Sequence, residues 1–84
     1  MIEGRLAPRF DPLENEESIL EVVTYHTPDS EQLLRFAEVR AATANFLRVL
    51  KNFVPPSADR TAAVRKVREA MFTANAAIAL RGKI

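Results

Sequence analysis

The sequence has no cysteine, no tryptophan, two glycines and a single histidine among its 84 residues. Disulfides and thiolate metal sites are therefore excluded, and one histidine cannot by itself form a histidine-rich metal site. Gly4 and Gly82 lie near the chain ends, so no glycine-rich loop can hold a phosphate. No apolar run approaches the roughly 18 residues of a membrane span, and the N-terminus lacks a signal-peptide layout. These absences predict a soluble, intracellular chain without metal or cofactor.

Charge is divided unevenly along the chain. Residues 1–34 contain eight acidic and two basic side chains, whereas residues 35–84 contain three acidic and ten basic ones. Such a division allows an acidic segment to pair with a basic helical body, within one chain or between chains. It also leaves a positive surface for phosphate groups.

The first of two long helices is expected at about residues 28–52. Thr27 can cap it, and Pro28 suits a first turn, where a backbone N–H has no intrahelical partner. At roughly 100° per residue, Arg40 lies near the middle of a broad apolar arc. The arc consists of Leu33, Phe36, Val39, Ala44, Phe46, Leu47, Leu50 and Phe53. A charge taken out of water must be paired, so Arg40 predicts an anionic partner on this face.

A second helix is expected at about residues 58–80. The Val54-Pro55-Pro56-Ser57 turn ends the first helix, Ser57 can cap the second, and Gly82 can terminate it. The predicted core face is Val64, Val67, Met71, Ala74 and Ile78, beside a small-residue strip of Ala63, Ala70 and Ala77. The fold class is therefore all-α, an antiparallel two-helix hairpin.

The apolar arcs of this hairpin are wider than one facing helix can cover. We therefore expect self-association, because a domain of this size buries too little surface to be stable without help. The alternative is that the N-terminal segment folds over the second face. We divide the chain into an N-terminal arm, residues 1–21, and a helical-hairpin domain, residues 22–84.

The arm is expected to be loose, with one short helix near residues 12–18 and an extended stretch into Tyr25. Residues 1–5 include Ile-Glu-Gly-Arg, the sequence cut by a coagulation protease that is used to remove purification tags. We assign these five residues no function.

Binding is favoured over catalysis by the side chains available. Nucleophilic or acid–base chemistry needs several titratable groups within reach of one another, and here only His26 titrates near neutrality. Tyr25 and His26 precede a helix, and Arg40 lies about three turns along it. An aromatic ring can stack on a base, and a guanidinium matches phosphate oxygens. These three residues could form a nucleotide site on an oligomer interface.

Four stretches of the hairpin resemble a known family: residues 24–28, 31–32, 54–60 and 69–79, the first reading Thr-Tyr-His-Thr-Pro and the last containing Ala-Asn-Ala-Ala-Ile-Ala. In this register they are similar to the phage anti-CBASS cyclic-oligonucleotide sponge family, over about residues 22–82. The resemblance implies a helical homohexamer that sequesters cyclic di- and trinucleotides without cleaving them, in the cytoplasm of the infected bacterial host.

The resemblance also implies two kinds of site. A tyrosine matching Tyr25 contacts cyclic dinucleotides between protomers, and a lysine, here Arg40, meets phosphate. A separate trinucleotide site uses an arginine matching Arg81 and a threonine that is Ala42 in this chain, which predicts weakened trinucleotide binding. Two alternatives remain from the residues alone: a basic hairpin that binds RNA or DNA, and a structural oligomer without a small ligand.

Overall fold

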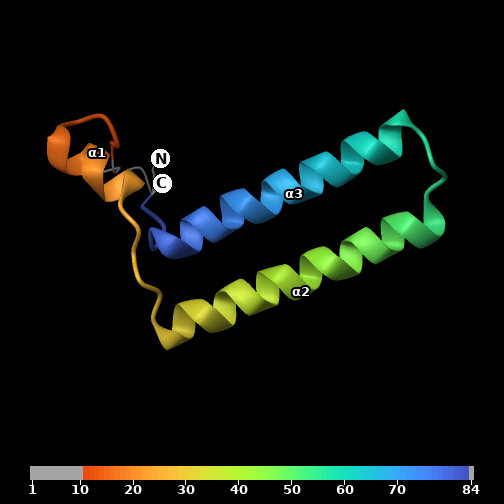
Figure 1. The fold of residues 1–84 in the computed structure, drawn as a ribbon, viewed down its shortest axis with the longest axis horizontal. Helices are drawn as coiled ribbons and strands as arrows, with labels where there is room; N and C mark the ends of the chain where they lie inside the picture. Colours follow the sequence, from red (N-terminus) through yellow and green to blue (C-terminus); the bar gives the residue numbers. More distant parts are fainter. Residues whose placement is uncertain (1–10, 84) are drawn as a thin grey trace, which may run out of the picture.

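The computed structural model describes residues 11–83, which form three α-helices and no strand (Figure 1). They are α1 (Glu16–Val23), α2 (Ser30–Phe53) and α3 (Ala58–Ala79). The two long helices lie side by side and antiparallel, and α1 lies beyond the end of the hairpin where α2 begins (Figure 1). The all-α expectation and the two-helix hairpin are confirmed. The expectations for residues 1–5 lie outside the described residues.

A capping box starts α2 two residues later than expected. The Asp29 carboxylate accepts a hydrogen bond from the Gln32 backbone N–H at 2.8 Å, and the Gln32 side-chain oxygen accepts one from the Asp29 N–H at 3.0 Å. Each side chain satisfies an N–H that would otherwise lack a partner. The prediction of Thr27 as the cap is wrong, because Asp29 and Gln32 make this reciprocal pair and Thr27 has no such partner.

The proline turn closes as the sequence indicated. The Ser57 hydroxyl accepts a hydrogen bond from the Arg60 N–H at 3.1 Å, which confirms Ser57 as the cap of α3. The Arg60 guanidinium in turn donates to the Val54 carbonyl at the end of α2, also at 3.1 Å. One arginine therefore ties the last turn of α2 to the first turn of α3.

The C-terminus of α3 ends in two residues of left-handed backbone. Arg81 has a φ of 55° and Gly82 a φ of 78°. The Gly82 N–H donates to the Ala77 carbonyl at 2.9 Å and the Arg81 N–H to the Ile78 carbonyl at 3.2 Å, the two bonds of a Schellman motif. Gly82 takes part in the termination as predicted, but Arg81 occupies the position that usually favours glycine.

The helix of the N-terminal arm lies later in the chain than expected. Asn15 caps α1 by accepting from the Ser18 N–H at 2.9 Å, and the helix continues to Val23. The extended stretch expected into Tyr25 is therefore wrong over residues 19–23. Valine and isoleucine favoured an extended interpretation, but a good cap and an acidic first turn stabilise the helix here.

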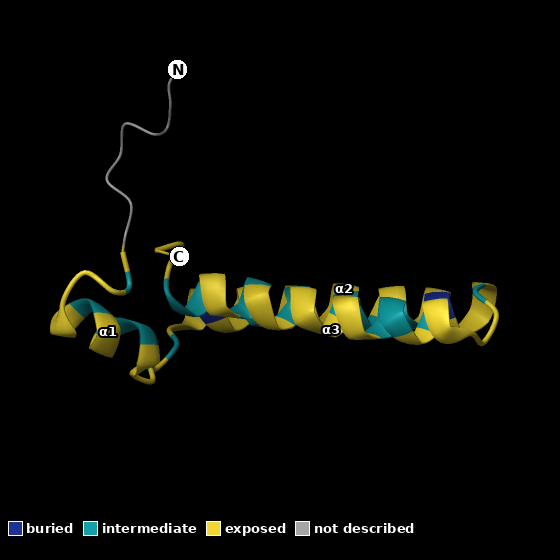
Figure 2. Cartoon of the chain, turned by 90° about the horizontal axis from the view of Figure 1, so that it is seen from above, coloured by how far each residue is buried: buried dark blue, intermediate teal, exposed yellow. Residues whose placement is uncertain are grey.

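The seam between α2 and α3 is thin. The predicted α3 core face is confirmed, since each of its five residues is partly buried, but among the described residues only Leu50 and Gln32 are buried. Phe46 and Phe53, both in the predicted apolar arc, are 50% and 80% exposed. Figure 2 shows exposed residues along the whole length of the hairpin. A single chain therefore leaves much of its apolar arc in contact with solvent.

Candidate functional site

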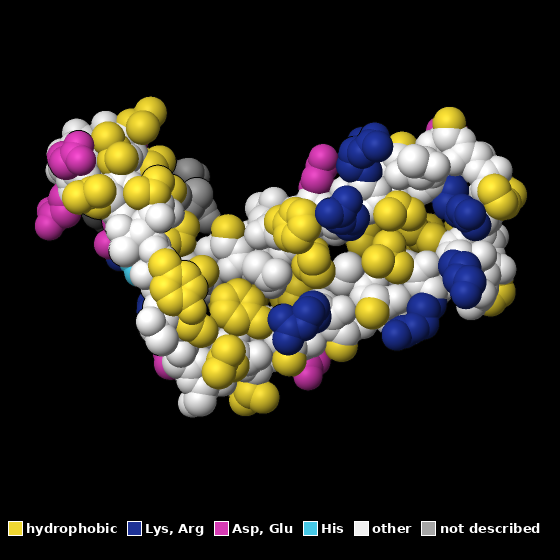
Figure 3. Space-filling model, viewed as in Figure 1, with side chains coloured by type: hydrophobic (Ala, Val, Ile, Leu, Met, Phe, Trp, Pro, Cys, Tyr) yellow, Lys and Arg dark blue, Asp and Glu magenta, His cyan; other side chains and the backbone are white. Residues whose placement is uncertain are grey.

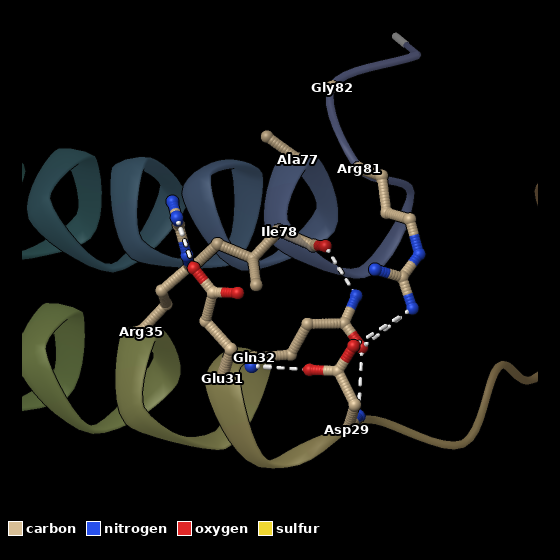
Figure 4. Close-up of a pocket in the computed structure, with 8 residues that line it drawn as sticks. All are labelled: Asp29, Glu31, Gln32, Arg35, Ala77, Ile78, Arg81 and Gly82. Atoms are coloured by element: carbon tan, nitrogen blue, oxygen red, sulfur yellow. Dashed lines mark hydrogen bonds and ion pairs between the residues drawn. The ribbon is translucent and has the colours of Figure 1, made fainter.

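Gln32 joins the start of α2 to the end of α3. Its side-chain amide donates to the Ile78 carbonyl at 2.9 Å, while the amide oxygen accepts the Asp29 N–H (Figure 4). The residue is only 6% exposed, so both groups depend on these partners. This contact fixes the relative position of the two helix ends that carry the surrounding charged side chains.

Arg81 reaches across this junction to α2. Its guanidinium donates to Asp29 Oδ2 at 3.1 Å and to Gln32 Oε1 at 3.5 Å (Figure 4). The hydrogen bond from the Gln32 backbone N–H, and then the Arg81 guanidinium, lower the pKa of Asp29 below its usual value. An anion that binds Arg81 must therefore compete with a carboxylate that is ionised at neutral pH.

Arg81 lines a hollow between the start of α2 and the end of α3, and a second arginine in this hollow, Arg35, is also paired. Arg35 Nη2 lies 2.7 Å from Glu31 Oε2, one turn earlier on α2, and this contact raises the pKa of the Arg35 guanidinium. Figure 4 shows the Arg35–Glu31 and Arg81–Asp29 pairs on either side of Gln32. The hollow, about 490 Å³, thus contains two carboxylates that offset two guanidinium groups.

Tyr25, His26 and Arg81 line a neighbouring hollow of about 370 Å³. Tyr25 is 80% exposed, so its ring is available for stacking. His26 Nε2 lies 2.8 Å from the Glu21 carbonyl oxygen, so the tautomer with a proton on Nε2 donates to it. The Glu21 carboxylate meets Lys83 Nζ at 2.7 Å, and that contact lowers its pKa. His26 and Arg81, which are 55 positions apart in the sequence, therefore line the same hollow.

Arg40 lies apart from these three residues. It is exposed on α2, ten residues after Ser30, which places it about 15 Å along the helix from that start. Within residues 11–83 its guanidinium has no hydrogen bond or ion pair. The arc that includes Arg40 is wider than the seam with α3, so the side chain remains in solvent in one chain.

Ala42 lies on the other side of α2 from Arg40 in helical periodicity. It lines an apolar groove with Phe46 of α2 and Ala70 of α3. Arg81 does not line this groove, so a single chain does not bring Arg81 and Ala42 together. A site that needs both residues would require more than one chain.

Comparison with known proteins assigns this hairpin to a family. Residues 14–79 match the family described as Acb2/Tad1, hairpin domain, and this range contains all three helices. The chain belongs to this family. Its members are phage anti-CBASS cyclic-nucleotide sponge proteins. No curated protein and no solved structure gives a match.

The family match includes α1 and places Tyr25, His26 and Arg40 inside the hairpin domain, whereas Arg81 follows its last matched residue. The role of Gln32 was not predicted, although Asp29 followed three residues later by glutamine is a recognisable capping-box pattern. Asn75 is partly buried, and its Oδ1 has no hydrogen-bond partner in the described part of the chain.

Two further findings concern other kinds of site. Across residues 11–83, no group of three or more histidine, aspartate or glutamate side chains is placed to hold a metal ion. In the same range, no helix has the length and apolar character needed to cross a membrane.

Proposed function

We propose that this chain sequesters cyclic dinucleotides, without cleaving them, at sites between the protomers of a homohexamer. Membership of the Acb2/Tad1 hairpin family is the observation that carries the proposal. In the cytoplasm of an infected bacterium, the protein would bind the second messengers of CBASS signalling and so prevent their detection. A second messenger is needed only at low concentration, so binding without turnover is sufficient when the protein is comparably abundant.

Tyr25 and Arg40 make the main contacts with the cyclic dinucleotide in this proposal. The exposed Tyr25 ring supplies a stacking surface for a base, with His26 beside it, and the unpaired Arg40 guanidinium supplies a fork for phosphate oxygens. Because these groups lie apart within one chain, Arg40 of a second protomer completes the pocket. The need for two chains supports binding at a protomer interface.

Arg81 is assigned to a separate site for cyclic trinucleotides. The absence of a hydroxyl at Ala42 and the competition from Asp29 for the guanidinium both weaken this site. We therefore propose that cyclic dinucleotides are the better ligands.

Calorimetry with a panel of cyclic dinucleotides tests the main pocket. Tyr25→Ala should weaken binding by about 10- to 100-fold, since stacking on an aromatic ring contributes about 1–3 kcal/mol per base. Arg40→Ala should weaken it at least as strongly, and Arg40→Lys should restore part of the affinity because it keeps the charge but not the fork. Arg48→Ala is the matched control, an exposed arginine two turns further along α2.

Two results would contradict the proposal. The first is wild-type affinity in both Tyr25→Ala and Arg40→Ala, with the hexamer intact. The second is recovery of a hydrolysed nucleotide from the denatured complex, which would indicate catalysis instead of sequestration. Preference for polynucleotide with a steep loss of affinity in salt would favour a nucleic-acid-binding hairpin.

A further inference from the structure

Among residues 11–83, the helix α1 packs against neither of the other two helices. Of the three helices, only α2 and α3 pack together. The described attachments of α1 are the ion pair between Glu21 and Lys83 and the contact of His26 with the Glu21 carbonyl. An isolated helix of eight residues is unstable in water, and most helical stability in proteins comes from packing. α1 therefore needs a surface to pack against.

The exposed face of α1 combines apolar and acidic side chains. Glu16, Leu20 and Val23 follow the i, i+4, i+7 spacing of one helix face, and Glu17 lies beside them. Leu20 and Val23 are 51% and 71% exposed. Residues 11–29 contain six acidic side chains and no lysine or arginine. The complementary surface must therefore be both apolar and basic.

One flank of α3 has this character. Arg65, Arg68 and Phe72 follow the i, i+3, i+7 spacing and are all exposed, Phe72 by 54%. The Arg68 guanidinium carbon lies 5.6 Å from the Phe72 ring centroid. A hollow of about 270 Å³ beside Arg65 and Arg68 has no acidic residue in its lining. Figure 3 shows lysine and arginine side chains around apolar groups on one face of the hairpin.

We propose that α1 of one chain packs on the flank of α3 formed by Arg65, Arg68 and Phe72 in a second copy. Both surfaces extend over eight residues, about 10 Å of helix between the first and the last, so their lengths match. Glu16 and Glu17 then meet the two arginines, and Leu20 and Val23 cover the Phe72 ring. Charge complementarity sets the register, and the apolar contact supplies most of the stabilisation.

The second copy is favoured over the chain itself because of where α1 is attached. The Glu21–Lys83 pair holds α1 beyond the end of the hairpin, whereas Arg65 lies 14 residues before the end of α3, about 21 Å away. Packing within one chain would therefore break the ion pair.

Engineered cysteines test the contact in the full chain, which contains no native cysteine. A copy with Leu20→Cys is mixed with a differently tagged copy with Phe72→Cys under mild oxidation. We expect a disulfide between the two tags, at least about fivefold more abundant than with Thr73→Cys. Thr73 is the matched control. It directly follows Phe72 and is also exposed, but its side chain points roughly 100° away around the helix axis.

Charge exchange gives a second, independent measurement. Arg65→Glu with Arg68→Glu should weaken self-association about tenfold, since like charges facing each other across an interface are strongly unfavourable. Mixing with a Glu16→Lys, Glu17→Lys copy should restore association. Arg48→Glu with Lys51→Glu is the charge-matched control on α2 and should not respond to the mixed partner.

The outcomes separate this inference from the proposed function, on whose self-association it rests. No disulfide between the Leu20→Cys and Phe72→Cys copies, or an equal yield with Thr73→Cys, would overturn the inference while light scattering still reports an oligomer. A monomer by light scattering in the unmutated protein would overturn the proposed assembly as well. Restoration of association by the exchanged charges supports the second copy as the partner of α1.

Discussion

Replacement of Gln32 probes the contact that joins the two ends of the hairpin. Gln32→Ala removes two short hydrogen bonds, the one to the Ile78 carbonyl and the one that Gln32 accepts from the Asp29 N–H, together with the 3.5 Å contact from the Arg81 guanidinium. Gln32→Met removes the same two bonds but keeps a side chain of similar length in a site that is only 6% exposed. The pair of variants therefore separates hydrogen bonding from packing.

The expected loss of stability follows from the number of bonds. A net contribution of about 0.5–1.5 kcal/mol for each hydrogen bond gives a loss of roughly 1–3 kcal/mol for both variants. Gln32→Ala also leaves a cavity and should be the less stable of the two. In a domain of this size, 2 kcal/mol corresponds to a fall in Tm of about 10 °C.

Thermal unfolding followed by circular dichroism measures the effect, with all variants at one protomer concentration because assembly contributes to stability. Glu31→Ala is the control, since it removes an exposed ion pair next to Gln32 and should change Tm little. A Tm for Gln32→Met equal to that of the wild type would refute the assigned role of the two hydrogen bonds.

Three other measurements test the assembly, the second site and the response to acid. Ala70→Glu places a charge in the apolar groove and should abolish the oligomer in light scattering. Arg81→Ala should remove cyclic-trinucleotide binding and preserve dinucleotide binding, and Ala42→Thr should raise trinucleotide affinity; no trinucleotide binding in any variant would leave Arg81 without that role. The pKa of Asp29 is lowered by a backbone N–H of α2 and by Arg81, so the stability it confers is present above its unfolded-state pKa and is lost as pH falls below about 4. Asp29→Asn should reduce this acid sensitivity, and an unchanged acid-unfolding curve would contradict the assignment.

The sequence predicted the hairpin because its signals are local. Two prolines and a capping serine end one helix and start the next within a few residues, and apolar periodicity identified the α3 core face. The errors arose where local signals compete. Thr27 and Asp29 are both good caps, and the choice depends on Gln32, whose amide must also reach Ile78 at the far end of the chain.

For the candidate site, too, the sequence predicted the residues but not their arrangement. Tyr25, His26 and Arg40 were assigned from residue type, position and family resemblance, and the family match includes all three. Their arrangement could not be read from the sequence, because it depends on where the helix ends lie. The fold brings Arg81 to Tyr25 and His26, pairs Arg81 with Asp29, and leaves Arg40 alone on the outside of α2.

The sequence by itself therefore determined the two long helices and their connection, because capping, proline geometry and periodicity act over a few residues. It indicated the family through the resemblance of four stretches of the hairpin. Only the tertiary structure decided which charges are already paired and which apolar side chains remain exposed. Those properties depend on contacts between residues more than 40 positions apart, such as Gln32 with Ile78 and Asp29 with Arg81. Two helices can cover only one side of each other, and within the described residues this geometry leaves α1 and the outer flanks of the hairpin without a packing partner.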